Sequence, residues 1–285
     1  MFVIPTLVTS AEQRKTFAAN RATGHIALSV AAHDGVTRRA SVHEDGSLRV
    51  RFPNATPAAL EAVLVNTGGG MTGGDRFSIE MNVGEGASLI AGTAAAEKIY
   101  RSSGADAEMD VRLTLAENAR LAWLPQETIL FDRARLKRRI DIDLADGATL
   151  TMAEAVVFGR AAMDEAMTQG FFTDAWRIRR GGKLIYADTA RLDGAIAGKL
   201  AERAVTHGGI AIATVLVAPG GEAELGQVRA LSENSNGGLL GEVGISAWNG
   251  LAVARLCAKD GASLRHDLIA VLAALGTPVP RLWLQ

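Results

Sequence analysis

The chain has 285 residues, of which 48% are hydrophobic, and its 30 Lys and Arg residues against 31 Asp and Glu residues leave a net charge of −1. This balance argues against a nucleic-acid-binding protein that relies on a broad positive field. The single cysteine, Cys257, excludes an intramolecular disulfide and is typical of a reducing compartment. No apolar run reaches the roughly 18 residues that a membrane span needs, and no secretory pattern opens the sequence. We therefore expect a cytoplasmic protein with neither a nucleic-acid nor a membrane partner.

Residues 1–20 and 53–59 hold few apolar anchors. We expect residues 1–20 to be a weakly ordered segment and 53–59 to be a loop. All-β domains often reach this size, so residues 21–285 are predicted to form a single β-rich domain.

A glycine-rich loop lies at residues 66–76, between two predicted strands. Its sequence is Asn66-Thr67-Gly68-Gly69-Gly70-Met71-Thr72-Gly73-Gly74-Asp75-Arg76. Glycine reaches positive φ without steric cost, so this composition predicts a tight loop that folds back on itself. A phosphate-binding loop would open a helix, whereas the alternation of Phe77, Ile79 and Met81 indicates a strand. A nucleotide site is therefore disfavoured.

One pattern recurs three times in the next 80 or so residues, at 83–89, 115–121 and 144–150. Each copy follows a strand of alternating polarity and precedes a more continuously apolar strand. The turns Glu85-Gly86, Glu117-Asn118 and Asp146-Gly147 place Gly or Asn where a positive φ is needed. Such strand–turn–strand units cannot bury a face alone, so they are expected to stack.

The predicted fold class is therefore mainly β, with a β-helix-like (solenoid-like) stacked-strand core over residues 45–190. An ordinary antiparallel sandwich with three similar hairpins is the alternative. A strand is expected at 209–217, and two short helices at 194–203 and 222–231. The leucine spacing from Leu264 to Leu275, followed by Gly276 and Pro278, predicts a C-terminal amphipathic helix at 260–276.

The glycine-rich loop and several later blocks resemble the urease accessory protein D family (UreD, called UreH in some bacteria). The blocks are residues 96–101, 123–132, 154–160, 176–182, 187–188, 192–194 and 246–250, and the loop contributes Gly68, Gly69, Gly70, Gly73, Gly74 and Asp75 as signature residues. So many ordered blocks over roughly residues 45 to 283 are an improbable coincidence.

The resemblance implies a urease-maturation scaffold and not an enzyme. Members of this family dock on apo-urease and bind the helical accessory protein F, which recruits the GTPase accessory protein G. Nickel is thought to pass through the interior of the D protein. The resemblance therefore implies that nickel binds only transiently and that no cofactor is tightly bound.

The sequence itself offers no strong metal or catalytic motif. Its five histidines are scattered and none pairs with another at ligand spacing, so no metal site and no catalytic residue are predicted.

Charged side chains inside the apolar repeat strands are the candidate functional residues, because burial of an unpaired charge is prohibitive. They are Glu97, Lys98, Glu127, Asp132, Glu154, Arg160 and Asp188, together with the polar Gln126. One interpretation is a structural ion-pair ladder that joins Lys98 to Glu127, and Arg160 to Asp132 or Glu154. The other is a polar internal path, because weak ligation by oxygen alone suits a metal ion in transit.

Two further hypotheses concern binding surfaces and a rival function. The glycine-rich loop and the C-terminal region are expected to bind partner proteins, with Trp283 either an exposed anchor or part of the chain's own core. The rival function is a β-solenoid polysaccharide-active enzyme with Glu127, Asp132 and Glu154 as paired acids. The aromatic content of 5% is low for a sugar-stacking groove and argues against it.

Overall fold

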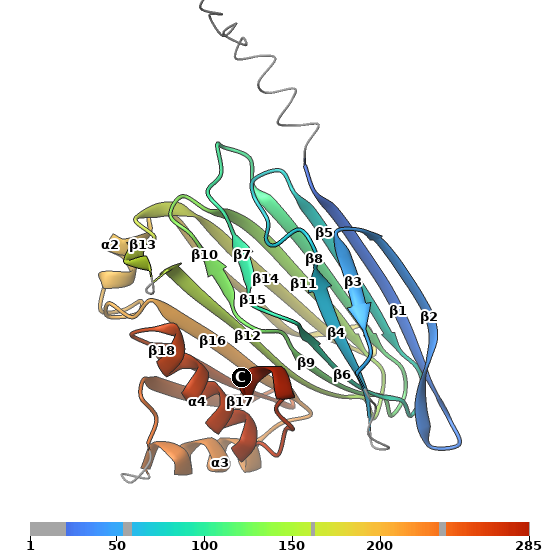
Figure 1. The fold of residues 1–285 in the computed structure, drawn as a ribbon. Coiled ribbons are helices and arrows are strands. Elements are labelled where there is room, and N and C mark those ends of the chain that lie inside the picture. The colour runs from blue at the N-terminus through green and yellow to red at the C-terminus, as the bar shows by residue number, and fades with distance from the viewer. Residues whose placement is uncertain (1–20, 54–58, 161–162, 234–237, 285) are drawn as a thin grey trace, which may run out of the picture.

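The computed structural model describes residues 21–53, 59–160, 163–233 and 238–284. It consists of two stacked β-sheets, with helices on the outer face of one of them (Figure 1). The predicted segment 1–20 lies outside the described residues, as does most of the predicted loop at 53–59.

The first sheet, sheet A, has the strand order β15-β14-β11-β8-β5-β1-β2. Its strands are β1 Thr23–His33, β2 Val36–Gly46, β5 Arg76–Val83, β8 Ala107–Leu115, β11 Arg135–Leu144, β14 Gln169–Arg180 and β15 Lys183–Ala195. The second sheet, sheet B, has the order β17-β18-β16-β12-β9-β6-β4-β3, and the short strands β7, β10 and β13 join it at one end. Its strands are β3 Leu48–Arg51, β4 Leu60–Asn66, β6 Ser88–Thr93, β7 Glu97–Ile99, β9 Arg120–Leu124, β10 Thr128–Leu130, β12 Thr149–Arg160, β13 Glu165–Ala166, β16 Ala211–Ala218, β17 Glu242–Trp248 and β18 Leu251–Ala258.

The repeat in the sequence corresponds to coils that stack in register. Val83, Leu115 and Leu144 pair across the parallel strands β5, β8 and β11 of sheet A. After the turn, Leu89, Leu121 and Leu150 pair in the same way across β6, β9 and β12 of sheet B. The stacked-strand prediction is thus confirmed. Among the described strands, antiparallel pairing involves the added strands β2, β3, β13, β15, β16, β17 and β18.

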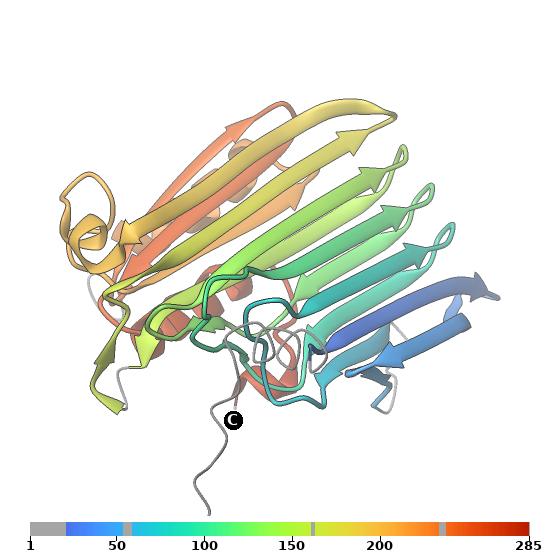
Figure 2. The same cartoon turned by 90° about the horizontal axis from the view of Figure 1, so that it is seen from above.

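The turns that join the two sheets lie side by side at one end of the sandwich (Figure 2). Gly86, Asn118 and Gly147 have φ values of 64°, 57° and 68°, as the composition of the turns predicts. The amide of Gly86 donates to Glu117 O at 3.1 Å and that of Asn118 to Asp146 O at 3.2 Å. Backbone hydrogen bonds therefore connect each turn to the next coil.

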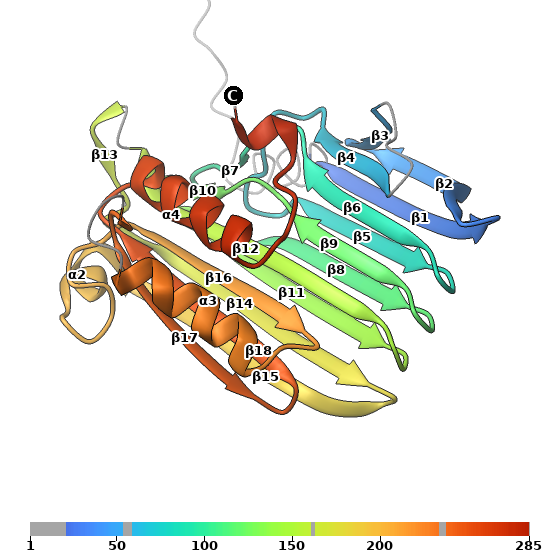
Figure 3. The same ribbon diagram turned by 90° about the horizontal axis from the view of Figure 1, so that it is seen from below.

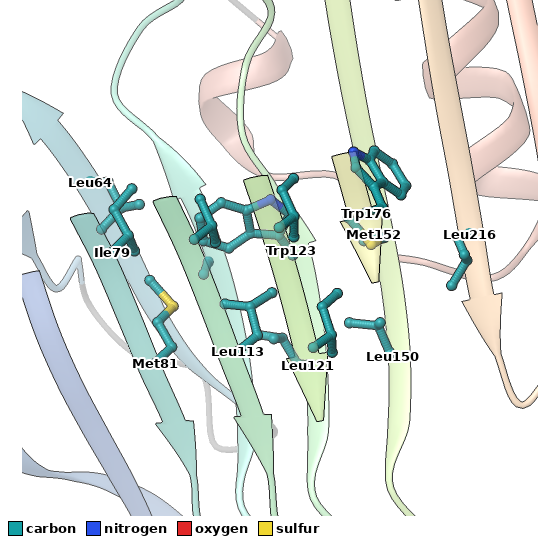
Figure 4. Close-up of a cluster of buried hydrophobic side chains, with 14 of the residues drawn as sticks. Leu64, Ile79, Met81, Leu113, Leu121, Trp123, Leu150, Met152, Trp176 and Leu216 are labelled. Atoms are coloured by element: carbon teal, nitrogen blue, oxygen red, sulfur yellow. The ribbon is translucent and has the colours of Figure 1, made fainter. Parts of the chain in front are cut away.

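The main core fills the space between the sheets. Alternate residues of each strand point inward, and Leu113, Leu121, Leu150 and their neighbours interdigitate there (Figure 4). Most of the charged residues of sheet A face outward and form exposed ion pairs between neighbouring strands, such as Arg112 with Glu80 at 3.9 Å. A charge ladder across the coils therefore exists, but on the solvent face.

Helices cover part of the outer face of sheet B (Figure 3). They are α3 Glu222–Glu233, α4 Gly261–Ala274 and the 3₁₀ turn η2 Arg281–Leu284, whereas α2 Ile196–Ala201 lies at one end of the sandwich against β14 and β15. Helix α4 begins where the Asp260 carboxylate accepts a hydrogen bond from Ser263 N at 2.7 Å. The apolar face of α4 packs on β16 and β18, so the predicted amphipathic helix is confirmed. Among the described helices, none combines the length and apolar character that crossing a membrane requires.

Candidate functional site

A cavity of about 160 Å³ lies between the two sheets, next to the glycine-rich loop. The exposed residues Gly69 and Lys98 line its outer end, and the buried residues Arg138 and Glu154 line its inner end. Apolar side chains such as Phe77 and Trp123 form much of the wall. The remaining polar lining comes from Asn66, Thr93, Glu97, Gln126 and Thr128. The cavity thus combines a largely apolar wall with a small set of polar and charged side chains.

A buried cluster of three charges closes the inner end of this cavity. Arg138, Glu154 and Asp174 are 3%, 5% and 7% exposed. Arg138 donates from Nη2 to Asp174 Oδ2 at 2.6 Å and from Nε to Asp174 Oδ1 at 3.0 Å, and from Nη1 to Glu154 Oε2. Trp123 Nε1 donates to Glu154 Oε1 at 2.7 Å. Both carboxylates are therefore paired with the same guanidinium.

Burial changes the protonation chemistry of both carboxylates that line the cavity. Desolvation raises the pKa of Glu97 to about 7, although the Asn66 amide, which donates to Glu97 Oε1 at 2.9 Å, partly offsets the rise. Desolvation also raises the pKa of Glu154, against the opposing charge of Arg138. Glu97 therefore changes charge near neutral pH at the outer part of the cavity.

Asp75 and Gly70 fix the shape of the glycine-rich loop. The buried Asp75 carboxylate accepts hydrogen bonds from Ala22 N at 2.9 Å and Thr72 N at 2.7 Å. Gly70 has φ 145°, and a Cβ there would lie 2.4 Å from the Tyr100 ring and 2.7 Å from Lys98 O. Gly69 and Gly74 also have positive φ, whereas Gly68 and Gly73 do not. The loop thus passes close to the chain that forms the outer end of the cavity.

Four of the predicted polar residues do not line this cavity. Glu127 Oε2 accepts from Arg265 Nη2 at 2.6 Å, and Asp132 Oδ1 accepts from Thr168 N at 2.7 Å. The other two form separate ion pairs: Arg160 with Glu165, and Asp188 with Arg255 at 2.7 Å.

The predicted ladder from Lys98 to Glu127, and from Arg160 to Asp132 or Glu154, is therefore wrong. The actual partners come from outside the three repeated coils, from α4, β13, β18 and the segment that precedes β14. The acids Glu127, Asp132 and Glu154 are each held by a different partner and do not converge on a cleft, which removes the geometric basis of the polysaccharide-enzyme alternative.

Trp283 belongs to the chain's own core. Its side chain is 4% exposed, and its Nε1 donates to Leu124 O at 3.2 Å. Arg265 Nη1 donates to Trp283 O at 3.2 Å and so ties the C-terminal turn to α4. Of the two alternatives for Trp283, the structure shows the packed one.

Sequence reasoning missed Arg138 and Asp174, although a signal for both was present. In β11, Arg138 has the same parity as the inward-facing Leu136, Ile140 and Ile142. In β14, Asp174 has the same parity as Phe172, Trp176 and Ile178. Because side chains alternate between the faces of a strand, a charge on the apolar parity must lie in the core. Across the described ranges, no three His, Cys, Asp or Glu residues are arranged to hold a metal ion.

Comparison with known proteins places these features in one family. The family model described as "UreD urease accessory protein" matches residues 22–284. A protein from Rhodopseudomonas palustris (strain HaA2), called "Urease accessory protein UreD", is 57% identical over 277 residues, which cover 97% of this chain and 98% of the relative. A protein of the same name from Bradyrhizobium diazoefficiens is 55% identical over 269 residues, covering 94% and 96% respectively. With this match spanning nearly all of its length, the chain belongs to the UreD family of urease accessory proteins.

Proposed function

We propose that this chain is a cytoplasmic, non-catalytic scaffold of urease maturation. It docks on apo-urease together with accessory protein F, and accessory protein F recruits the GTPase, accessory protein G. Nickel reaches the urease metallocentre through the interior of this chain and does not stay there. Family membership supports the maturation role, and the distribution of charge inside the sandwich supports the passage of a cation.

The observation that carries the proposal is the placement of Glu97 and Glu154 along one cavity. Both contribute carboxylate oxygens, and the described residues provide neither a thiolate nor an imidazole in the cavity lining. Ni²⁺ prefers nitrogen ligands, so oxygen donors of this kind hold it weakly. Weak binding lets an ion leave as readily as it enters. Glu154 at the inner end is paired with Arg138, so it offers carboxylate oxygens to the cavity without being an unpaired buried carboxylate.

The test separates docking from metal passage. In cells that lack the chromosomal copy, the wild-type chain, Glu97→Gln and Glu97→Leu are each expressed with urease and accessory proteins F and G. We expect all three chains to co-purify with urease and its partners, and the two variants to lower the nickel content of urease several-fold. Glu80→Gln, on the solvent face of sheet A, is the matched control and should behave like wild type.

Two results bear on different parts of the proposal. Full urease activation without any copy of this chain contradicts the scaffold role itself. Normal nickel loading with Glu97→Leu, in a complex that assembles normally, contradicts only the passage through the cavity.

A further inference from the structure

Two histidines that are 18 residues apart in sequence meet on the outer face of sheet A. His25 lies on β1 and His43 on β2, and their ring centroids are 5.5 Å apart with the ring planes inclined by 52°. In the antiparallel register His25 faces Asp45, and His43 faces Ala27, so the two imidazoles form a diagonal pair across the strands. Ile26 and Leu28 point into the core, which places His25 on the opposite, outer face.

Within the described residues, both imidazoles lack a hydrogen-bonding partner in the protein. Throughout the described ranges, the ring nitrogens of His25 and His43 make no hydrogen bond or ion pair with protein atoms. His266, by contrast, places Nδ1 3.1 Å from Asp267 Oδ1. The nitrogen lone pairs of the His25–His43 pair are therefore available to an external ligand.

The separation of the rings matches that of two imidazoles on one metal ion. With a metal–nitrogen bond of about 2.0–2.1 Å, each ring centroid lies roughly 3.2 Å from the metal, so angles of about 90–120° separate the centroids by roughly 4.5–5.5 Å. The observed 5.5 Å falls at the wide end of that range. Asp45, on the same face as His43 and directly across from His25, adds negative charge at this position.

We propose that His25 and His43 form a two-imidazole chelating site for a transition-metal dication such as Ni²⁺, Cu²⁺ or Zn²⁺, with water completing the coordination. Imidazole is a preferred ligand of all three ions. The site lies on the outer face of sheet A and shares no residue with the cavity. It therefore neither needs nor supports passage of metal through the interior, and it stands apart from the proposed function.

Metal titration of the untagged full-length chain tests this site. Isothermal titration calorimetry with Ni²⁺ and with Zn²⁺ is run on wild type, His25→Asn, His43→Asn and the double variant. All four are measured in the Glu97→Gln background, which removes one carboxylate of the cavity from the titration. We expect one bound dication per chain at this site, with affinity at least about tenfold weaker in each single variant. The double variant should lose less affinity than the sum of the two single losses, because losing one imidazole already destroys the chelate.

A spectroscopic measurement identifies the ligands directly. With one equivalent of Cu²⁺, the electron paramagnetic resonance spectrum should show two coupled imidazole nitrogens in wild type and one in each single variant. His33→Asn, an exposed histidine at the end of the same strand β1, is the matched control and should leave both measurements unchanged. Unchanged Ni²⁺ and Zn²⁺ affinity in the single variants would overturn the proposal. Independent, additive losses in the double variant would also overturn it, because they mean two separate histidines and no chelate.

Discussion

Arg138 on β11 and Glu154 on β12 form an ion pair across the interior, so a guanidinium from sheet A holds a carboxylate from sheet B at the inner end of the cavity. The Asp174 carboxylate on β14 accepts hydrogen bonds from Nε and Nη2 of the same guanidinium. One arginine thus pairs with two buried carboxylates that come from different strands, β12 and β14.

Removal of Arg138 should strongly destabilise the fold. Arg138→Leu leaves Glu154 and Asp174 buried without a counter-charge, which costs about 3–5 kcal/mol of unfolding free energy. Chemical denaturation followed by circular dichroism measures the loss. Arg112→Leu, which breaks an exposed pair on the solvent face, should cost less than about 1 kcal/mol and serves as the control. Equal losses in the two variants would contradict the assignment of a buried charge cluster.

The raised pKa of Glu97 predicts a pH-dependent stability. Because the folded pKa is about 7 and the ordinary value is 4.5, the folded chain holds the proton more tightly than the unfolded chain. This contribution is fully present below about pH 4.5 and is lost as pH rises through 7, with an upper limit of about 3 kcal/mol. Glu97→Gln cannot ionise and keeps an oxygen for the Asn66 amide. Its unfolding free energy, measured between pH 5.5 and 8, should therefore fall less with pH than that of wild type; parallel curves would show that Glu97 ionises normally.

Gly70 should be the least replaceable glycine with positive φ in the glycine-rich loop. In Gly70→Ala the new methyl group meets the Tyr100 ring and Lys98 O, and the backbone keeps an unfavourable φ. In Gly69→Ala the φ of 76° is also unfavourable, but nothing lies within 4 Å of the new methyl group. We expect a loss of about 1–2 kcal/mol for Gly69→Ala from backbone strain alone and a clearly larger loss for Gly70→Ala. Thermal denaturation compares the two, and a Gly70→Ala chain as stable as Gly69→Ala would refute the close approach.

We expect Trp283 to contribute to the stability of the fold and not to the binding of a partner protein. Trp283→Ala removes a buried indole and its hydrogen bond to Leu124 O, and is expected to cost about 3–5 kcal/mol. Leu284 is 66% exposed, so Leu284→Ala should change stability by less than about 0.5 kcal/mol. The melting temperatures of the two variants measure the difference. A Trp283→Ala variant that melts like wild type while losing partner binding would restore the anchor hypothesis.

Local patterns were enough to predict the coils, but not the partners of the charged residues. The three turns and the alternation before them depend on φ and on side-chain parity, both of which are readable over a few residues. The partner of Glu127 lies 138 residues away on α4, and no spacing within the repeat indicates it. Arg138 is easily overlooked because it stands among three other basic residues of β11, where its inward parity can be mistaken for part of a solvated face. The cavity is lined by residues of both sheets, so the pattern of any single strand does not predict it.

The antiparallel strands at the two edges of sheet A have a consequence for self-association. The five strands from β14 to β1 run parallel to one another, so an exposed edge of that block would be a template on which an identical chain could add in the same direction. The edge strands β2 and β15 run antiparallel to their neighbours β1 and β14. The exposed edges of sheet A therefore do not have the strand direction of the parallel block. The reversals therefore end the parallel stack at both edges of sheet A.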